Sequence, residues 1–111
     1  MNPLGRQYIV LFEKCIDQFI SNPDYVTSVI LEAAIGSGLH VLNSLEHRFD
    51  PQGLTYILLL SQSHLIVHTW PEYKTLVLDL YACSDDFDFE SFIEKIVKIS
   101  QAEEIKKIRV F

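Results

Sequence analysis

The sequence predicts an α+β fold, a two-layer sandwich in which two helices lie on one face of a mainly antiparallel sheet. Short apolar segments between turn residues recur along the chain, and two other segments have apolar residues at helical spacing. Strands and helices do not alternate strictly, which argues against a parallel sheet. With 111 residues, 49% of them hydrophobic, the chain can bury one modest core. We therefore expect a single domain over residues 1–111.

The first half of the chain predicts three strands and one helix. They are a strand at 7–12, a helix from residue 22 through Ala34, a strand at 40–49 and a strand at 54–60. Asn22-Pro23-Asp24 supplies the turn and the N-cap of the helix, and Gly36-Ser37-Gly38 ends it. Residues 40–49 alternate as strand residues do, and Asp50-Pro51-Gln52-Gly53 forms the turn to the next strand.

The second half predicts a hairpin, a helix and a final strand. The strands are expected at 64–69, 75–81 and 105–111. Residues 61–63 form a small polar break before the hairpin, and its turn lies at 71–74. Acids at 85–88 precede a helix. Its apolar positions are Phe89, Phe92, Ile93, Ile96, Val97 and Ile99. Because the first and last strands are short and apolar, we expect a second subunit to cover an edge, as in a homodimer.

Charge and hydropathy exclude two classes of partner. The net charge is −6, and the nine Lys and Arg residues are scattered, so we expect no nucleic-acid partner. The longest apolar run, 54–60, is too short to cross a bilayer, and the first residues do not form a secretory signal. We expect a cytoplasmic protein that does not bind membranes.

The cysteines and histidines do not predict a metal site. Cys15 and Cys83 are too few for a disulfide framework and lack metal-ligand spacing. The four histidines are not spaced with cysteines or carboxylates as ligands on a helix would be.

Residues 61–73 combine hydroxyls, imidazoles, an indole and a carboxylate with apolar residues, which favours chemistry over a purely structural strand. In the alternative, His64 and His68 share one face of a half-buried strand and only make structural hydrogen bonds. A hairpin turn centred between Glu72 and Tyr73 would pair Trp70 with Thr75, His68 with Val77, and Gln62 with Cys83. We expect this register to gather the Ser63 hydroxyl, the Cys83 thiol and the His68 base around one point.

The same stretch resembles the self-processing site of bacterial and archaeal S-adenosylmethionine decarboxylases, in which a Ser-His-x-x-x-His-Thr-Trp-Pro-Glu run follows the cleavage point. The run occupies residues 63–72. The resemblance covers most of the chain without gaps. It includes Leu4-Gly5-Arg6, Asn43-Ser44, His47-Arg48-Phe49, Pro51-Gln52-Gly53 and residues 79–83.

The resemblance implies a proenzyme that cuts itself between Gln62 and Ser63. The Ser63 hydroxyl would attack the carbonyl of Gln62, and elimination and hydrolysis would leave a β chain, 1–62, and an α chain, 63–111. A pyruvoyl group derived from Ser63 would cap the α chain and bind the amine of the small-molecule substrate as a Schiff base. Decarboxylation of S-adenosylmethionine would then yield the aminopropyl donor for spermidine synthesis.

The resemblance also implies roles for single residues. Cys83 is expected to return a proton to the substrate, and His68 to act as the base that assists elimination during cleavage. Thr55 takes the place of a family serine that supports the same step.

For substrate binding, the resemblance places Phe49 and Trp70 near the adenosyl group and Glu72 near the ribose. In the alternative, both aromatic residues serve in ordinary packing, and Glu72 is a solvated turn residue.

Four departures from the family pattern leave two other functions open. Gln62 replaces a glutamate, Leu11 an acid, Gln7 a histidine and Lys74 a glycine. Losing an acid and gaining a cation would alter how a cationic substrate is held, which favours a pyruvoyl-dependent ornithine or arginine decarboxylase. Gln62 and Thr55 are also compatible with an uncleaved regulatory paralogue.

Overall fold

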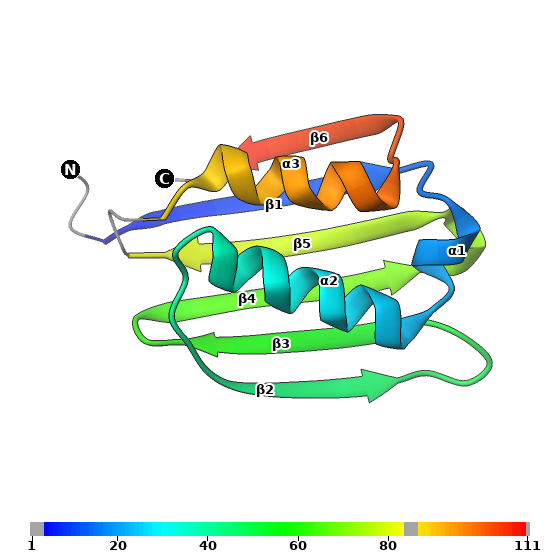
Figure 1. The fold of residues 1–111 in the computed structure, drawn as a ribbon, viewed down its shortest axis with the longest axis horizontal. Helices are drawn as coiled ribbons and strands as arrows, with labels where there is room; N and C mark the ends of the chain where they lie inside the picture. The colour runs from blue at the N-terminus through cyan, green and yellow to red at the C-terminus, as the bar shows by residue number, and fades with distance from the viewer. Residues whose placement is uncertain (1–3, 84–86, 111) are drawn as a thin grey trace.

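The computed structural model describes residues 4–83 and 87–110, which form one six-stranded sheet with its helices on one face (Figure 1). In chain order the elements are β1 (Arg6–Glu13), α1 (Asp17–Ile20), α2 (Pro23–Gly36), β2 (Val41–Arg48), β3 (Leu54–Leu60), β4 (Ser63–Trp70), the 3-10 helix η1 (Pro71–Tyr73), β5 (Thr75–Ala82), α3 (Phe89–Ser100) and β6 (Glu104–Arg109). The strand order is β2-β3-β4-β5-β1-β6, and every neighbouring pair is antiparallel. The α+β sandwich is therefore confirmed, with the single-turn helix α1 as an addition.

The two long helices begin where their capping residues predict. The Asn22 side chain accepts a hydrogen bond from the backbone N–H of Tyr25, with Pro23 in the first helical turn. Helix α3 begins after Asp88, whose side chain accepts from the N–H of Ser91. Of the acids expected before α3, Asp85 and Asp86 lie outside the described residues, as does Phe111 at the end of the last strand.

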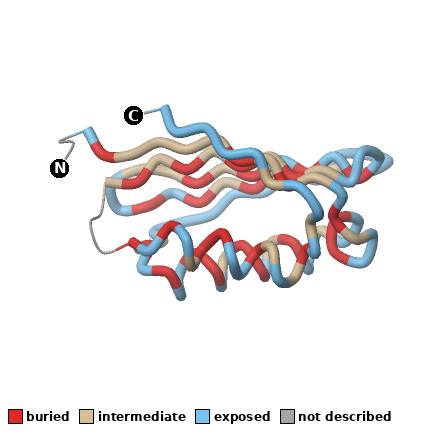
Figure 2. Tube along the Cα trace, turned by 90° about the horizontal axis from the view of Figure 1, so that it is seen from above, coloured by how far each residue is buried: buried red, intermediate tan, exposed pale blue. Residues whose placement is uncertain are grey.

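The core lies between the helices and the sheet face that they cover (Figure 2). Alternate residues of the central strands are fully buried there, as in Leu76, Leu78 and Leu80 of β5, and they pack with Phe92 and Ile30 from the helices. The other face of the sheet is uncovered. It carries Ile9, Leu11, Ile57, Leu59, Ile66 and Val77, each intermediate or exposed.

One edge of the sheet is not the strand that the sequence predicted, since the first strand was expected to be an edge. β6 is an edge, but β1 lies inside the sheet between β5 and β6, and the second edge is β2. The apolar sequence of β1 reflects pairing on both sides rather than an edge. β2 contacts a neighbouring strand only through β3, and nearly all of its residues are exposed.

Candidate active site

Strand β4 forms the axis of the candidate site, and its pairing confirms the predicted hairpin register. Trp70 lies opposite Thr75 and His68 opposite Val77, so the chain turns where η1 lies. The positive φ of 52° at Lys74 completes this turn. The Lys74 ammonium lies 3.8 Å from Asp17 of α1.

The hydroxyl and the thiol lie together at one end of the sheet. Ser63 begins β4 directly after the exposed residues Ser61 and Gln62, and Cys83 follows the end of β5. Both line a small cavity of about 50 Å³, which Gly38, Leu39 and His40 also line. The predicted neighbourhood of Ser63, Gln62 and Cys83 is therefore present.

The base and the aromatic residues lie at the other end. The Oγ1 of Thr55 is 2.9 Å from the Nδ1 of His68, a hydrogen bond whose donor depends on the tautomer of the histidine. Both residues line a cavity of about 330 Å³. Its other walls include Phe49, Trp70 and Glu72, together with Gln52, Gly53, Leu54 and Thr69. All the residues expected to bind substrate thus surround one cavity.

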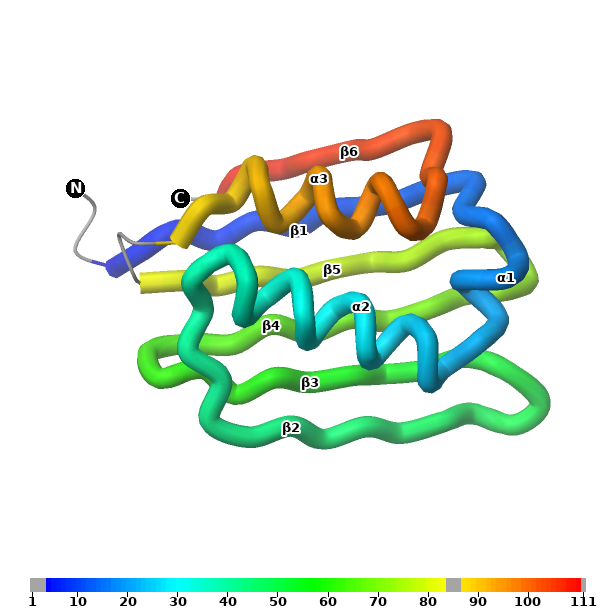
Figure 3. The backbone as a smooth tube through the Cα atoms, viewed as in Figure 1, coloured from blue at the N-terminus to red at the C-terminus, as the bar shows by residue number. Residues whose placement is uncertain are grey.

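The expectation that Ser63, Cys83 and His68 meet at one point within a chain is wrong. Ser63 and His68 are five residues apart on the same strand, which separates them by about 16 Å. Figure 3 shows the two groups of elements at opposite ends of the sheet, with the β3–β4 turn at one end and the β2–β3 loop at the other. Because an extended strand cannot fold back, one chain holds these two groups of residues at separate places.

The N-terminal segment forms a wall against the Cys83 thiol. Gly5 has a φ of 88°, and a Cβ atom there would lie 2.7 Å from the carbonyl oxygen of Ala82 and 2.9 Å from the Sγ of Cys83. The carbonyl of Leu4 accepts a hydrogen bond from the Tyr81 hydroxyl and lies 3.8 Å from the Cys83 sulfur. Desolvation, and then the neighbouring Cys83, raise the pKa of the Tyr81 phenol.

A polar group next to Ser63 could not be assigned a role from the sequence. Gln7 donates a hydrogen bond of 3.1 Å to one carboxylate oxygen of Asp79, and the Nε2 of His64 lies 3.6 Å from the other. The His64 Nε2 is buried and makes no hydrogen bond within the described part of the chain. The alternation of β4 and β5 places His64, Asp79 and Tyr81 on the uncovered face, which was the available signal.

A larger groove of about 430 Å³ lies between α2 and α3, lined by residues such as Val29, Lys95 and Lys98, and it contains none of the predicted site residues. Over residues 4–83 and 87–110, no three His, Cys, Asp or Glu side chains cluster as metal ligands would. In the same ranges, every helix is too short or too polar to span a bilayer.

Comparisons with known proteins agree on one family. A family model described as "S-adenosylmethionine decarboxylase" matches residues 6–110. Proteins named "S-adenosylmethionine decarboxylase proenzyme" from Thermosipho melanesiensis and Thermotoga maritima are 36% and 33% identical to this chain. The alignments cover 98% and 95% of this chain and 86% and 81% of theirs. The crystal structure of an adenosylmethionine decarboxylase from Aquifex aeolicus shares the fold, with a TM-score of 0.86, 23% identity, and coverage of 98% of this chain and 90% of that one.

Proposed function

Because the chain belongs to the S-adenosylmethionine decarboxylase family, we propose that it decarboxylates S-adenosylmethionine after cutting itself between Gln62 and Ser63. The product would be the aminopropyl donor for spermidine synthesis. The observation that carries this proposal is the arrangement of β4, which begins at Ser63 beside Cys83 and ends at the aromatic cavity beside His68. This arrangement has the proposed cleavage site at the start of the strand and a binding pocket at its end, so it accounts for both parts of the proposed activity.

The fold is compatible with a cut at Gln62–Ser63. The cut would fall in an exposed turn, outside the buried core. The piece 1–62 would contribute β1, which lies between β5 and β6 of the piece 63–111, and β3, which pairs with β4. The two pieces therefore interleave in one sheet, and their strand pairing holds them together as a single domain after cleavage.

The residues around Ser63 fit a pyruvoyl group at the new end of β4. Such a group supplies an electron sink for the loss of carbon dioxide from an α-amino acid. The Cys83 thiol lines the same cavity and is assigned to hold the proton that returns to the substrate carbon. His68, bonded to Thr55, is assigned to accept the proton that leaves during self-cleavage.

Two half-sites in each chain favour a homodimer in which each complete site uses both subunits. The uncovered sheet face is apolar along its middle, as Ile57, Ile66 and Val77 illustrate. A two-fold axis that lies in the plane between two such faces, perpendicular to the strands, would stack the faces of two copies with their strands running in opposite senses. Ser63 and Cys83 of one chain would then face Thr55 and His68 of its partner.

The cavity at the aromatic end suits an adenosyl group. Phe49 and Trp70 are each about half exposed and present rings that could stack on a purine or contact a sulfonium. Glu72 lies in the same wall and could accept hydrogen bonds from ribose hydroxyls. Lys74 does not line this cavity, and its ammonium is directed to Asp17, so it does not oppose a cationic substrate there.

The test first checks by intact mass whether the protein has been cleaved. The release of labelled carbon dioxide is then measured with carboxyl-labelled S-adenosylmethionine, ornithine and arginine as substrates. We expect two fragments, and turnover of S-adenosylmethionine alone. Turnover of ornithine or arginine instead would reassign the substrate. A single uncut chain without turnover would favour the regulatory paralogue.

Replacing Cys83 should separate cleavage from catalysis. We expect Cys83→Ala to cut itself like the parent protein, because the thiol is not needed for the attack of Ser63. Its decarboxylation rate should fall by about 100-fold or more, which is typical of losing a general acid. Intact mass and kcat measure the two steps, and Cys15→Ala is the control, because Cys15 is buried in the core. Normal decarboxylation by Cys83→Ala would show that another group returns the proton.

A further inference from the structure

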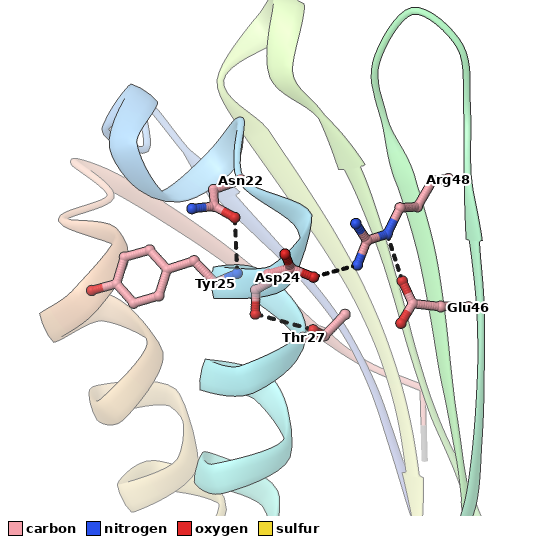
Figure 4. Close-up of polar contacts among 6 residues, drawn as sticks. All are labelled: Asn22, Asp24, Tyr25, Thr27, Glu46 and Arg48. Carbon is pink, nitrogen blue, oxygen red and sulfur yellow. Dashed lines mark hydrogen bonds and ion pairs between the residues drawn. The ribbon is translucent and has the colours of Figure 1, made fainter.

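Arg48 joins the edge strand β2 to the helical layer. Its Nη2 lies 2.6 Å from the Oδ1 of Asp24, in the first turn of α2, and its Nε lies 2.8 Å from the Oε2 of Glu46 (Figure 4). A guanidinium can bridge two carboxylates in this way because its donors are fixed in a planar fork. Arg48 thus connects the end of a strand to the start of a helix.

The helical side of this bridge is well anchored. Asn22 caps α2 through the N–H of Tyr25, and the Thr27 hydroxyl donates to the backbone carbonyl of Asp24 (Figure 4). The negative charge of Asp24 is also favourable at the positive end of the helix dipole. The backbone of Asp24 is therefore fixed within the first turn of α2, and its carboxylate is available to the end of the edge strand.

The strand side of the bridge leads directly to the aromatic cavity. Phe49 follows Arg48 and donates its backbone N–H to the carbonyl of Gly53 at 2.9 Å. Its ring packs edge-on against His47, with 4.6 Å between centroids, and lines the same cavity as Trp70. Because Phe49 is 51% exposed, few packing contacts hold it, and its position depends on the backbone before and after it.

We propose that the bridge from Arg48 to Asp24 positions Phe49 as a wall of the adenosyl pocket, which makes Arg48 a positioning residue for substrate binding. This inference rests on the proposed function. Exposed ion pairs contribute little to global stability, so the loss of this one should act locally on the pocket. Binding of the adenosyl group should weaken, and binding is the quantity to measure, because Thr55 and His68, which are assigned to self-cleavage, line the same cavity as Phe49.

The test measures binding without turnover, in the uncut Ser63→Ala protein. Trp70 is the single tryptophan of the chain and lies in the pocket, so its fluorescence reports occupancy directly. The probe is 5′-methylthioadenosine, which carries the adenosyl group without the amino acid. We expect Arg48→Gln to raise the Kd by about three- to five-fold, the effect of losing the exposed ion pair with Asp24, since the second pair, with Glu46, joins two residues of the same strand.

Variants of both residues of the bridge, Arg48 and Asp24, distinguish positioning of Phe49 from a general effect on the structure. Asp24→Asn should weaken binding as Arg48→Gln does, and the double variant should be no weaker than Arg48→Gln, because the contact between residues 48 and 24 is already lost in that variant. Lys107→Gln is the matched control: Lys107 of the other edge strand lies 3.8 Å from Glu90 in the first turn of α3, far from the pocket. In processed enzyme, Arg48→Gln should raise KM by the same factor with kcat unchanged.

Three outcomes would overturn the inference. Equal Kd values for Ser63→Ala with and without Arg48→Gln would show that the bridge does not position the pocket. Equal weakening by Lys107→Gln would show a general effect on the sheet. Failure of Ser63→Ala itself to bind the probe would remove the adenosyl pocket, and the proposed substrate would fall with it.

Discussion

Ser63→Ala should remain a single uncut chain of 12.8 kDa, whereas the parent protein should separate into two fragments on a denaturing gel. The expected loss is complete, because alanine has no oxygen to attack the carbonyl of Gln62. Ser63→Ala should also lack any carbonyl that reacts with hydrazine or borohydride. Intact mass of freshly purified and of incubated protein measures cleavage, and the mass change after treatment with hydrazine or borohydride measures the carbonyl.

Ser61→Ala is the matched control for this prediction. Ser61 is a hydroxyl in the same exposed turn, and it is held through its backbone N–H to the carbonyl of His40, which the substitution leaves in place. It should cut like the parent protein. Cutting of Ser63→Ala at the same bond, or loss of cutting in Ser61→Ala, would contradict the assignment of the nucleophile.

Mixing two inactive variants should restore cleavage if each complete site uses both chains. Neither Ser63→Ala nor His68→Ala should cut itself alone. In a mixed dimer, one site combines the Ser63 of the His68→Ala chain with the His68 of the Ser63→Ala chain. We expect the His68→Ala chain, identified by a mass tag, to be cut after co-expression. The effect is a change from no cleavage to cleavage.

The control for mixing is a chain that carries both substitutions. Ser63→Ala/His68→Ala can form a dimer with His68→Ala but cannot supply an imidazole, so no cleavage should follow. If the first mixture also stays uncut although mixed dimers are present, the half-sites do not combine across the uncovered sheet face. Cleavage of His68→Ala alone would show instead that His68 is not the base.

The hairpin and the helix boundaries were predictable because their signals are local. Period-two alternation and the turn after Trp70 were sufficient to pair His68 with Val77, and the side chain of Asn22 was sufficient to start α2. Helix α1 was missed because four residues are too few for a periodic pattern. The position of β1 inside the sheet also could not be read from its sequence, because pairing partners are distant in the chain.

The separation of Ser63 from His68 shows where the reasoning from sequence failed. The register was right, but the step from pairing to a common site ignored the length of β4 between Ser63 and His68. The contact of Leu4 with Cys83 spans 79 residues, and like that of Gly5 it has no local signal. Asp79 and Tyr81 were visible as polar residues in an apolar strand, but their partners on neighbouring strands were not.

The interleaving of β1 between β5 and β6 has a consequence for the order of events during biosynthesis. While the backbone is continuous, these three strands find one another within one molecule. Once the bond at 62–63 is broken, a denatured sample must reassemble from two separate polypeptides, and the rate of recovery becomes dependent on concentration. Maturation should therefore follow folding, and renaturation after the cut should be slow in dilute solution.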